Sequence, residues 1–437
     1  MIDERESWGS RIGFILASIG YAVGIGNLWR FPSMVGKYGG GIFLLFYLLV
    51  VFLIGIPMLS VEISLGKATR KDPVGAYKLL RPRTPWFLNG YVNVLTNLVI
   101  TGYVAPVAGW IAAYFFKSLA GVFSKMSPGE IETYYQNFTS NPLEVTLWTL
   151  ILIGGLVVVL LRGVRRGVER INKILMPGLF LILLFLITRS LSLEGAGKGI
   201  AFYLKPDFSK FTVEAALAAV GQAFFSMGIA LSAAHIFGSY MRKQDKIVPN
   251  AVIIGMSDLF IAVLAGFMIF PIVFAFGLDP GSGFGLTFIT MPNIFNQLPL
   301  GNLIAAAFYL LFFMAAFTSF LGGTEAIVAH LKDQWNIPRK AGTFIMGGLV
   351  LTIAVLASTS TKVFEKVDYA CNNIFLILGA LLMVIFVGRV WPLKEFFKVA
   401  EVQKKPAQVF WMIIIKYFAP VMLILIWLSQ LGIIKIR

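Results

Sequence analysis

The feature that most constrains this chain is the stretch at residues 11–40, RIGFILASIGYAVGIGNLWRFPSMVGKYGG. It is apolar and long enough to cross a bilayer, which takes about 20 residues. Its middle is broken by AVGIGN at residues 22–27, and the charged Arg30 follows soon after. Lipid offers no partner for the backbone groups that such a break frees. We therefore expect the break to line a cavity, where these groups can bind ions and small zwitterions.

Composition places the whole chain in a membrane. Of 437 residues, 58% are hydrophobic and only 13% are charged, and the mean hydropathy is +0.83, whereas soluble domains are nearer half apolar and a quarter charged. The lone cysteine, Cys371, excludes an internal disulfide and a cysteine metal cluster. The two histidines, His235 and His330, are too few for a metal site. No pattern of catalytic residues indicates an enzyme.

Apolar runs recur along the full length, and we expect a single transmembrane domain over residues 1–437. The predicted fold is an all-α polytopic membrane protein with about eleven transmembrane helices. The predicted spans are roughly 10–34, 41–66, 88–121, 143–162, 168–190, 212–240, 246–276, 300–333, 341–359, 366–390 and 408–434.

The net charge of +16 follows the loops. Every second loop is rich in Lys and Arg, and the loops between them hold few. The basic loops carry Lys67, Arg70, Lys71, Lys78, Arg81, Arg83; Arg162, Arg165, Arg166, Arg170, Lys173; Arg242, Lys243, Lys246; Lys332, Arg339, Lys340; and Arg389, Lys394, Lys398, Lys404, Lys405. This bias predicts a multi-pass protein of the cell membrane with the N-terminus in the cytoplasm and, because the span count is odd, the C-terminus outside. The charge is expected to meet lipid headgroups, not nucleic acid.

A weak internal repeat points to the arrangement of the spans. Residues 16–26, LASIGYAVGIG, are similar to LAAVG at 217–221 followed by MGIA at 227–230. The two lie five spans apart, so the second enters the membrane from the opposite side. This predicts inverted repeats at about 10–190 and 212–390, with helices 1 and 6 broken and an extra helix at about 408–434. Chance similarity of Ala- and Gly-rich helices is the alternative.

Several motifs together resemble a known family. Trp8, residues 11–14, the run at 20–27, Arg-Phe-Pro at 30–32 and the glycines at 39–41 closely resemble the neurotransmitter:sodium symporter (SNF) family. Bacterial eleven-span amino-acid:sodium symporters of the leucine-transporter fold look nearest. The resemblance covers nearly the whole chain and implies two sodium sites and an amino-acid site between the broken helices.

The resemblance implies that one sodium site, Na2, uses the carbonyls of Gly20, Val23 and Ala315 with the hydroxyls of Thr318 and Ser319. Na⁺ prefers such hard oxygens. The alternative is that the two hydroxyls bond back to carbonyls of their own helix, as Ser and Thr often do.

The other implied sodium site, Na1, uses the Ala22 carbonyl, Asn27, Ser226 and a residue of span seven. Asp258 is our choice, because an acid inside an apolar span is by default functional; a shifted alignment would place Ser257 there instead. Where chloride-dependent relatives carry a serine this chain has Ala262, so Asp258 would supply the negative charge and chloride should not be required.

The substrate site is implied in the same way. The amides of Ile25 and Gly26 would bind a carboxylate, since helix N-termini attract anions. The carbonyls of Ala22, Phe225 and Ser226 would bind an ammonium. The remaining implied contacts are Gly24, Val104, Gly228, Leu231, Ser319 and Gly323, with Tyr103 as the alternative to Val104. The family usually places a tyrosine in span three, and the count gives Val104 at that position, with Tyr103 beside it. The apolar lining favours a hydrophobic amino acid.

Two charged pairs match the gates of the family. Arg30 and Asp368 would form the outer gate above Phe225, where Gln222 would assist Arg30. Arg5 and Asp333 would form the inner gate, with Trp8 and Tyr240 nearby. For the inner pair the alternative is ordinary solvated loop charge. Glu62, an acid in span two, is predicted to accept hydrogen bonds from the broken part of span six.

The predicted function is sodium-coupled import of an amino acid by alternating access. The inward movement of Na⁺ across the lipid bilayer drives it. The alternatives are sodium-coupled transport of a non-standard small zwitterion and a transporter-like channel or sensor. A channel would show a ring of carbonyls or charges along a pore, and the sequence shows neither.

Overall fold

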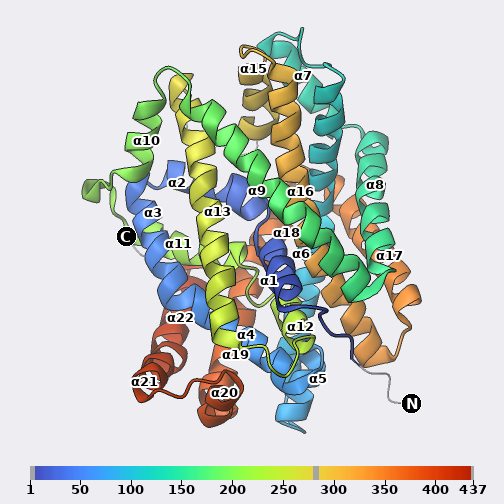
Figure 1. Ribbon diagram of the computed structural model, residues 1–437, viewed down its shortest axis with the longest axis vertical. Coiled ribbons are helices and arrows are strands. Elements are labelled where there is room, and N and C mark those ends of the chain that lie inside the picture. Colours follow the sequence, from blue (N-terminus) through green and yellow to red (C-terminus); the bar gives the residue numbers. More distant parts are fainter. Residues whose placement is uncertain (1–4, 279–284, 435–437) are drawn as a thin grey trace.

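The computed structural model describes residues 5–278 and 285–434, and over these residues the chain is helical, with no strand beyond an isolated bridge between Gly40 and Pro206. Residues 1–4, 279–284 and 435–437 lie outside the description, and so does the part of the single-domain prediction that covers them. The helices form an upright bundle in which α1 lies near the centre (Figure 1).

Nine continuous helical segments of the described chain are long and apolar enough to cross a bilayer. Here η marks a π- or 3₁₀-helical turn. In chain order they are α3–η2–α4 (Gly41–Val50, Val51–Gly55, Ile56–Thr69), α6 (Phe87–Leu119), α8 (Pro142–Leu160), η3–α9 (Val164–Val168, Glu169–Leu191), α13 (Ile247–Ala275), α16 (Gly301–Trp335), α17 (Arg339–Ser358), α18–η6–α19–η7 (Thr361–Tyr369, Ala370–Phe375, Leu376–Ile385, Phe386–Val390) and α21–η8–α22 (Lys405–Ile413, Ile414–Phe418, Ala419–Gln430).

Two further spans are broken where the sequence predicts. The first is α1 (Arg11–Ala22), followed by η1 (Gly26–Arg30) and α2 (Phe31–Lys37), with a bend of 50°. The second consists of α11 (Val213–Ser226) and α12 (Ala233–Ser239), separated by non-helical residues 227–232. Together with the nine continuous segments they confirm the predicted all-α fold with about eleven spans. The boundaries of the inverted repeats stay a prediction.

Short helices cover both ends of the bundle. They are α5 (Pro73–Leu80), α7 (Pro128–Thr139), α10 (Ala196–Leu204), η4 (Phe208–Lys210), η5 (Leu286–Thr290), α15 (Met291–Phe295) and α20 (Leu393–Val399).

The first break is stabilised locally by Asn27. Helix α1 ends because Val23 turns to an extended conformation, with φ −76° and ψ 100°. The Asn27 Oδ1 atom then accepts the Gly24 N–H at 3.1 Å, and the Gly24 carbonyl accepts the Asn27 N–H at 3.1 Å. A side chain at Gly24 would stand 2.5 Å from the Ser319 hydroxyl, so this close approach requires glycine.

The second break is stabilised by an acid from another helix. Gly228, Ala230 and Ser232 all have positive φ, which ends the helical ladder between α11 and α12. The Ala230 N–H freed in this way donates to Glu62 Oε2 at 2.8 Å. Glu62 on α4 is buried, and this contact confirms its predicted role as an acceptor for the break.

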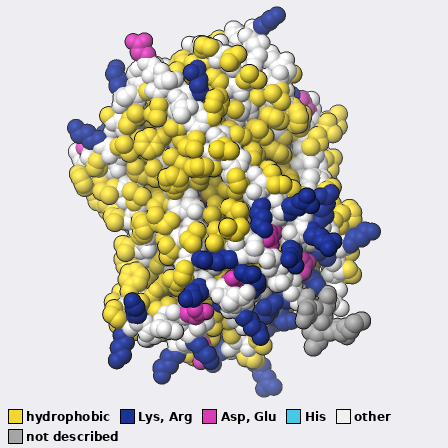
Figure 2. Space-filling model, viewed as in Figure 1, with side chains coloured by type: hydrophobic (Ala, Val, Ile, Leu, Met, Phe, Trp, Pro, Cys, Tyr) yellow, Lys and Arg dark blue, Asp and Glu magenta, His cyan; other side chains and the backbone are white. Residues whose placement is uncertain are grey.

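The broken helices occupy the interior, and intact helices cover them. Helix α1 packs against α9, α12, α13 and α16, while α6 packs against α16 and α17. The outward faces of α8, α9 and α22 expose large apolar side chains. The face shown in Figure 2 is hydrophobic over most of its height, and its Lys and Arg side chains gather mainly toward the lower end. Such a belt with a basic end suits a membrane.

Candidate functional site

A small cavity of about 100 Å³ lies between the two broken helices. All the predicted substrate contacts except Tyr103 line it. Its walls are Tyr21, Ala22, Gly24, Ile25 and Gly26 of the first break, Asn97, Ile100, Thr101 and Val104 of α6, Phe225, Ser226, Gly228 and Leu231 of the second break, and Ala316, Ser319, Phe320 and Gly323 of α16. It is mostly apolar, with a few polar groups, as binding sites for small molecules commonly are.

The cavity faces the ends of helices, and this sets its electrostatics. Helix α11 ends at Ser226, so its last carbonyls point toward the break, while η1 starts at Gly26 with its first N–H groups. These ends carry partial negative and positive charge respectively. A side chain at Gly26 would stand 3.1 Å from the Phe225 ring, so the two breaks meet closely here. The arrangement suits a ligand that carries both an anionic and a cationic group.

Tyr21 ties the two breaks together. Its hydroxyl donates to the Gly228 carbonyl at 3.2 Å, and a side chain at Gly228 would stand 2.4 Å from the Tyr21 ring. With φ of +61° and no room for a Cβ atom, position 228 requires glycine on two grounds.

The residues predicted for Na2 come together around Ser319. Its hydroxyl lies 3.4 Å from the Gly20 carbonyl, 3.3 Å from that of Val23 and 2.8 Å from that of Tyr21, all on α1 or its break. This serine thus reaches across to the other helix and does not bond back to its own.

Thr318 behaves differently from its neighbour. Its hydroxyl lies 3.0 Å from the Met314 carbonyl and 3.1 Å from that of Ala315, both on its own helix. For Thr318 the bond predicted as the alternative is therefore present. The same side chain faces α1, because a Cβ atom at Gly20 would stand 3.1 Å from Thr318 Cβ.

The residues predicted for Na1 surround a buried carboxylate. Asp258 Oδ1 accepts the Asn27 amide at 2.7 Å, and both carboxylate oxygens lie 3.0 Å from the Ser226 hydroxyl. Asp258 is fully buried, whereas Ser257 is partly exposed, so the structure places Asp258 and not Ser257 beside these residues. Ala22, the fourth predicted member, lines the adjoining cavity.

No cationic side chain of the described residues balances Asp258. Within residues 5–278 and 285–434, no Lys, Arg or His forms an ion pair with it. A buried carboxylate without a counter-ion is costly. Hydrogen bonds from Asn27 and Ser226 offset part of this cost, and a cation bound beside them would offset more.

Of the two candidates in span three, Val104 lines the cavity and Tyr103 does not. The Tyr103 hydroxyl instead donates to Asp368 Oδ1 at 2.8 Å. Adjacent residues of a helix point about 100° apart, so only one of the two can face the cavity. Pro106 lies within α6 but does not interrupt it, because the helix is continuous from Phe87 to Leu119.

The predicted outer pair is apart in this structure. No ion pair is present between Arg30 and Asp368, two residues of the described chain; the Arg30 guanidinium lies 4.3 Å from the centre of the Phe225 ring. Asp368 is held by Tyr103 and by the Asn372 amide at 2.8 Å. Gln222, predicted to assist Arg30, instead donates to the Gly26 carbonyl at 3.0 Å.

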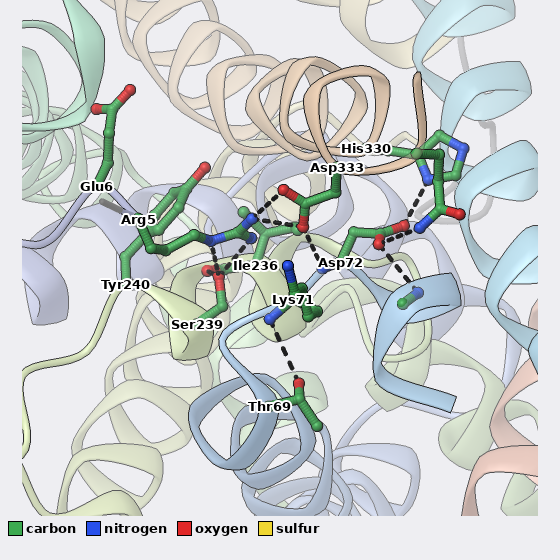
Figure 3. A network of polar contacts seen from close by, with 12 residues as sticks. Arg5, Glu6, Thr69, Lys71, Asp72, Ile236, Ser239, Tyr240, His330 and Asp333 are labelled. Carbon is green, nitrogen blue, oxygen red and sulfur yellow. Dashed lines mark hydrogen bonds and ion pairs between the residues drawn. The ribbon is translucent and has the colours of Figure 1, made fainter. Parts of the chain in front are cut away.

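The predicted inner pair is joined. The Arg5 guanidinium contacts both oxygens of Asp333 and donates to the Ser239 hydroxyl at 2.7 Å (Figure 3). It also lies 5.0 Å from the centre of the Tyr240 ring. Trp8 is buried beside it, with its indole N–H donating to the Phe237 carbonyl at 3.0 Å.

A buried acid extends this inner network. The Asp72 N–H donates to Asp333 Oδ2 at 2.6 Å, and the Asp72 carboxylate lies 2.6 Å from both His330 Nδ1 and Gln334 Nε2 (Figure 3). Burial raises the pKa of Asp72, but the contacts with His330, the Gly75 N–H and Gln334 outweigh it and lower the pKa below its usual value. The carboxylate is therefore stabilised in its charged form.

The sequence interpretation missed part of the site. Asn97 and Thr101 line the cavity with Val104, and the Asn97 amide donates to the Gly323 carbonyl at 2.8 Å. Their spacing of four and three residues puts them on one helix face, a signal the sequence contained. The contact between Asp72 and His330 had no such signal, because the two are 258 residues apart.

Comparisons with known proteins agree with this geometry. A model described as the sodium:neurotransmitter symporter family matches residues 5–130 and 139–436. The uncharacterized sodium-dependent transporter YhdH of Bacillus subtilis (strain 168) is 32% identical, over 98% of both chains. The human sodium- and chloride-dependent creatine transporter 1 is 27% identical, over 84% of this chain and 67% of that protein. The crystal structure of MhsT in complex with L-phenylalanine is 33% identical with a TM-score of 0.91, covering 98% of this chain and all of that one.

Proposed function

Because this chain belongs to the sodium:neurotransmitter symporter family, a family of sodium-dependent membrane transporters and not of enzymes, we propose that it imports a hydrophobic amino acid together with Na⁺. The observation that carries the proposal is the cavity between the two broken helices, which adjoins the buried carboxylate of Asp258. Helix ends of opposite polarity suit a zwitterion, and the apolar wall suits a hydrophobic side chain. The similar MhsT binds L-phenylalanine, which supports this substrate class.

The sodium sites proposed for this chain follow from the clusters of oxygen atoms. Na1 would use Ala22, Asn27, Ser226 and Asp258, where the carboxylate would bind the cation directly. Na2 would use Gly20, Val23, Ala315, Thr318 and Ser319, where a cation would replace the hydrogen bonds that Ser319 makes to the carbonyls of α1. Na⁺ at Na2 would thereby join α1 to α16, and Na⁺ at Na1 would join the first break to α13.

The proposed cycle uses the charged pairs at the two ends. With Arg5 and Asp333 joined and Arg30 and Asp368 apart, the structure suits a state closed on the inner side. Substrate would enter past Arg30 and settle beneath Phe225. Pairing of Arg30 with Asp368 and separation of Arg5 from Asp333 would then release it inside. The N-terminus would be cytoplasmic and the C-terminus outside.

Transport is tested with purified protein in liposomes. We expect uptake of hydrophobic amino acids to require an inward Na⁺ gradient and to stop when an ionophore dissipates it. A panel should include polar amino acids and non-standard zwitterions such as creatine. Uptake that is independent of Na⁺, or a current that does not saturate with substrate, would contradict symport. Uptake of non-standard zwitterions alone would retain symport but reject an amino acid as substrate.

The Na2 proposal is tested by replacing Thr318 and Ser319 with alanine. Each lost oxygen ligand weakens cation binding, so the Na⁺ concentration for half-maximal substrate binding should rise at least about tenfold, the equivalent of about 1.4 kcal/mol. The matched control is Thr352→Ala with Ser358→Ala, which removes hydroxyls bonded to i−4 carbonyls of α17. Equal sodium dependence in both double variants would count against the site.

The proposal also includes independence from chloride. Asp258 supplies a buried negative charge beside Na1, and Ala262, one turn further on, is fully buried and offers no hydroxyl to an anion. Uptake should be unchanged within about twofold when gluconate replaces chloride, because the fixed carboxylate already balances the cation. A strict requirement for chloride would show that Asp258 does not play this part.

A further inference from the structure

A second hollow, remote from the cavity between the breaks, is lined by basic side chains. It has a volume of about 1060 Å³, is open to solvent, and lies where α8 ends and η3–α9 begins. Five cations line it: Arg162, Arg165, Arg166, Arg170 and Lys173. All five are exposed, and Figure 2 shows Lys and Arg side chains gathered on the right of the view, over the junction of α8 and α9.

The carboxylate in the hollow is already engaged. Glu169 Oε2 accepts the Gly9 N–H at 2.7 Å, while Glu169 Oε1 accepts the Ser10 hydroxyl at 2.8 Å and the Lys173 ammonium at 2.6 Å. Within the residues that the structure describes, none of the four arginine side chains forms an ion pair or a hydrogen bond. Among residues 5–278 and 285–434, the hollow therefore holds an excess of positive charge that no side chain balances.

Three other arginines at this end of the molecule are paired with carboxylates. Arg5 pairs with Asp333, Arg339 pairs with Glu6 and Glu325, and Arg242 pairs with Asp245. In contrast, the four guanidinium groups of the hollow stand together, and no described carboxylate pairs with any of them. Guanidinium groups match phosphate oxygens in a two-pronged geometry, so a cluster of them is suited to a phosphate-bearing anion.

The surroundings of the hollow indicate which kind of phosphate-bearing anion suits it. Its apolar member, Leu161, is 40% exposed, and Val158, Ile174 and Leu181 on the adjoining helices are 52%, 62% and 66% exposed. The most apolar windows of α8 and η3–α9 are only 39% and 33% buried within the protein. The basic hollow thus continues into a lipid-facing apolar surface. A ligand with both a charged head and an acyl tail fits this combination.

We propose that this hollow binds the headgroup of an anionic phospholipid from the leaflet at that end of the protein, with the acyl chains along α8 and α9. Basic pockets between spans recognise such headgroups in general. The proposal depends neither on the transported substrate nor on the sodium sites.

A bound lipid would act on the inner network through the segment before α1. Glu6 Oε2 accepts the Val164 N–H at 2.7 Å, and a Cβ atom at Gly9 would stand 2.6 Å from Arg165 Nε. The turn that carries the arginines therefore contacts the segment that carries Arg5. A bound anionic headgroup would reduce the repulsion among the four arginines. It would thereby stabilise this turn and, with it, the joined pair of Arg5 and Asp333.

The test compares lipids on the full-length protein in detergent. Phosphatidylglycerol should raise the melting temperature and remain bound in native mass spectrometry, whereas phosphatidylcholine and inorganic phosphate at equal concentration should not. A variant with Arg162, Arg165, Arg166 and Arg170 changed to glutamine should bind phosphatidylglycerol at least about tenfold more weakly. An equal shift with inorganic phosphate would overturn the assignment to a lipid.

The matched control removes the same charge elsewhere at this end. Lys394, Lys398, Lys404 and Lys405 are exposed, and changing them to glutamine should leave the affinity for phosphatidylglycerol within about twofold. Equal losses in both variants would show a general charge effect and overturn the proposal, as would undiminished binding in the arginine variant.

A second variant guards against misfolding. If the glutamine variant is not monodisperse, changing the same four arginines to lysine keeps the charge but removes the guanidinium fork. This variant should still lose affinity severalfold, because two-pronged contacts to phosphate are lost. Unchanged affinity in the lysine variant would then overturn the proposal.

Discussion

The two ends of the molecule, which the proposed orientation makes the outer and the inner end, each carry an arginine and an aspartate, but the structure holds the two pairs differently. At the inner end Arg5 contacts both oxygens of Asp333. At the outer end Arg30 rests on the Phe225 ring while Tyr103 and Asn372 hold Asp368. The same residue types thus give a joined pair at one end and separated partners at the other, and the neighbouring hydrogen bonds make the difference.

The neighbours act in opposite senses. At the inner end, Ser239 binds Arg5 and the Asp72 N–H binds Asp333, so each neighbour orients its partner toward the pair. At the outer end, the bonds from Tyr103 and Asn372 compete with Arg30 for Asp368. The attraction within a largely buried ion pair is offset by the cost of removing both charges from water, so a few hydrogen bonds decide whether such a pair forms. In the proposed transport cycle this balance reverses.

The largest effect is expected from Asp333→Asn. The side chains of Arg5 and Asp333 are only 12% and 9% exposed. The substitution would leave the buried charge of Arg5 unpaired, which costs about 3–5 kcal/mol. The inner side should open, uptake should fall at least about tenfold, and a cysteine placed at the buried Val328 should react faster with a thiol reagent. Cys371→Ser provides the background without other thiols.

Asp368→Asn in the same background is the control for that experiment. It changes the outer pair and should not speed the reaction at position 328. If Asp333→Asn leaves both uptake and reactivity at their original level, the inner pair does not hold that side closed.

A smaller effect is expected from Asp368→Asn on transport itself. Because Arg30 does not contact Asp368 in this state, equilibrium Na⁺-dependent substrate binding should change less than about threefold, whereas turnover should fall severalfold, since closure requires the pair. Uptake kinetics and binding measured on the same preparation separate the two quantities. Tyr103→Phe, which keeps the carboxylate but removes one bond that competes with Arg30 for it, should not lower turnover. Equal loss of binding and turnover in Asp368→Asn would contradict the separated pair.

The smallest effect is on the stability of the inner network. The pKa of Asp72 is lower in the folded protein than in the unfolded chain, where it is about 3.9. The Asp72 charge therefore stabilises the folded protein above this pH, and the stabilisation is lost as the pH falls through the folded pKa. Asp72→Asn should lower the free energy of unfolding by about 1.5–3 kcal/mol at pH 7, the usual range for hydrogen bonds to a charged group. The difference from the wild type should shrink below about pH 4.

The matched control lies toward the outer end. Asp207→Asn changes an exposed acid whose bonds to Ser209 are local, and it should have little effect on the melting temperature at either pH. A pH-independent difference between Asp72→Asn and the wild type would show that the Asp72 charge does not stabilise the inner network.

The fold was largely predictable from the sequence. Glycine pairs and polar residues inside apolar runs located both broken spans, because a helix in lipid cannot lose its hydrogen bonds without a partner. Most of the cavity followed from the same stretches together with the motif at residues 20–27. In span three the count along the helix gave Val104, which lines the cavity, while the alternative, Tyr103, does not; Asn97 was missed although its spacing from Val104 placed it on the same face.

The sequence by itself determined where the helices break, which apolar runs span the membrane and which acids lie within them, because these are local properties of the chain in a lipid environment. Only the tertiary structure decided that Ser319 reaches the carbonyls of α1, that Tyr103 binds Asp368, and that Asp72 joins the inner network. These choices depend on competition among partners hundreds of residues apart, and packing alone sets the distances that decide it.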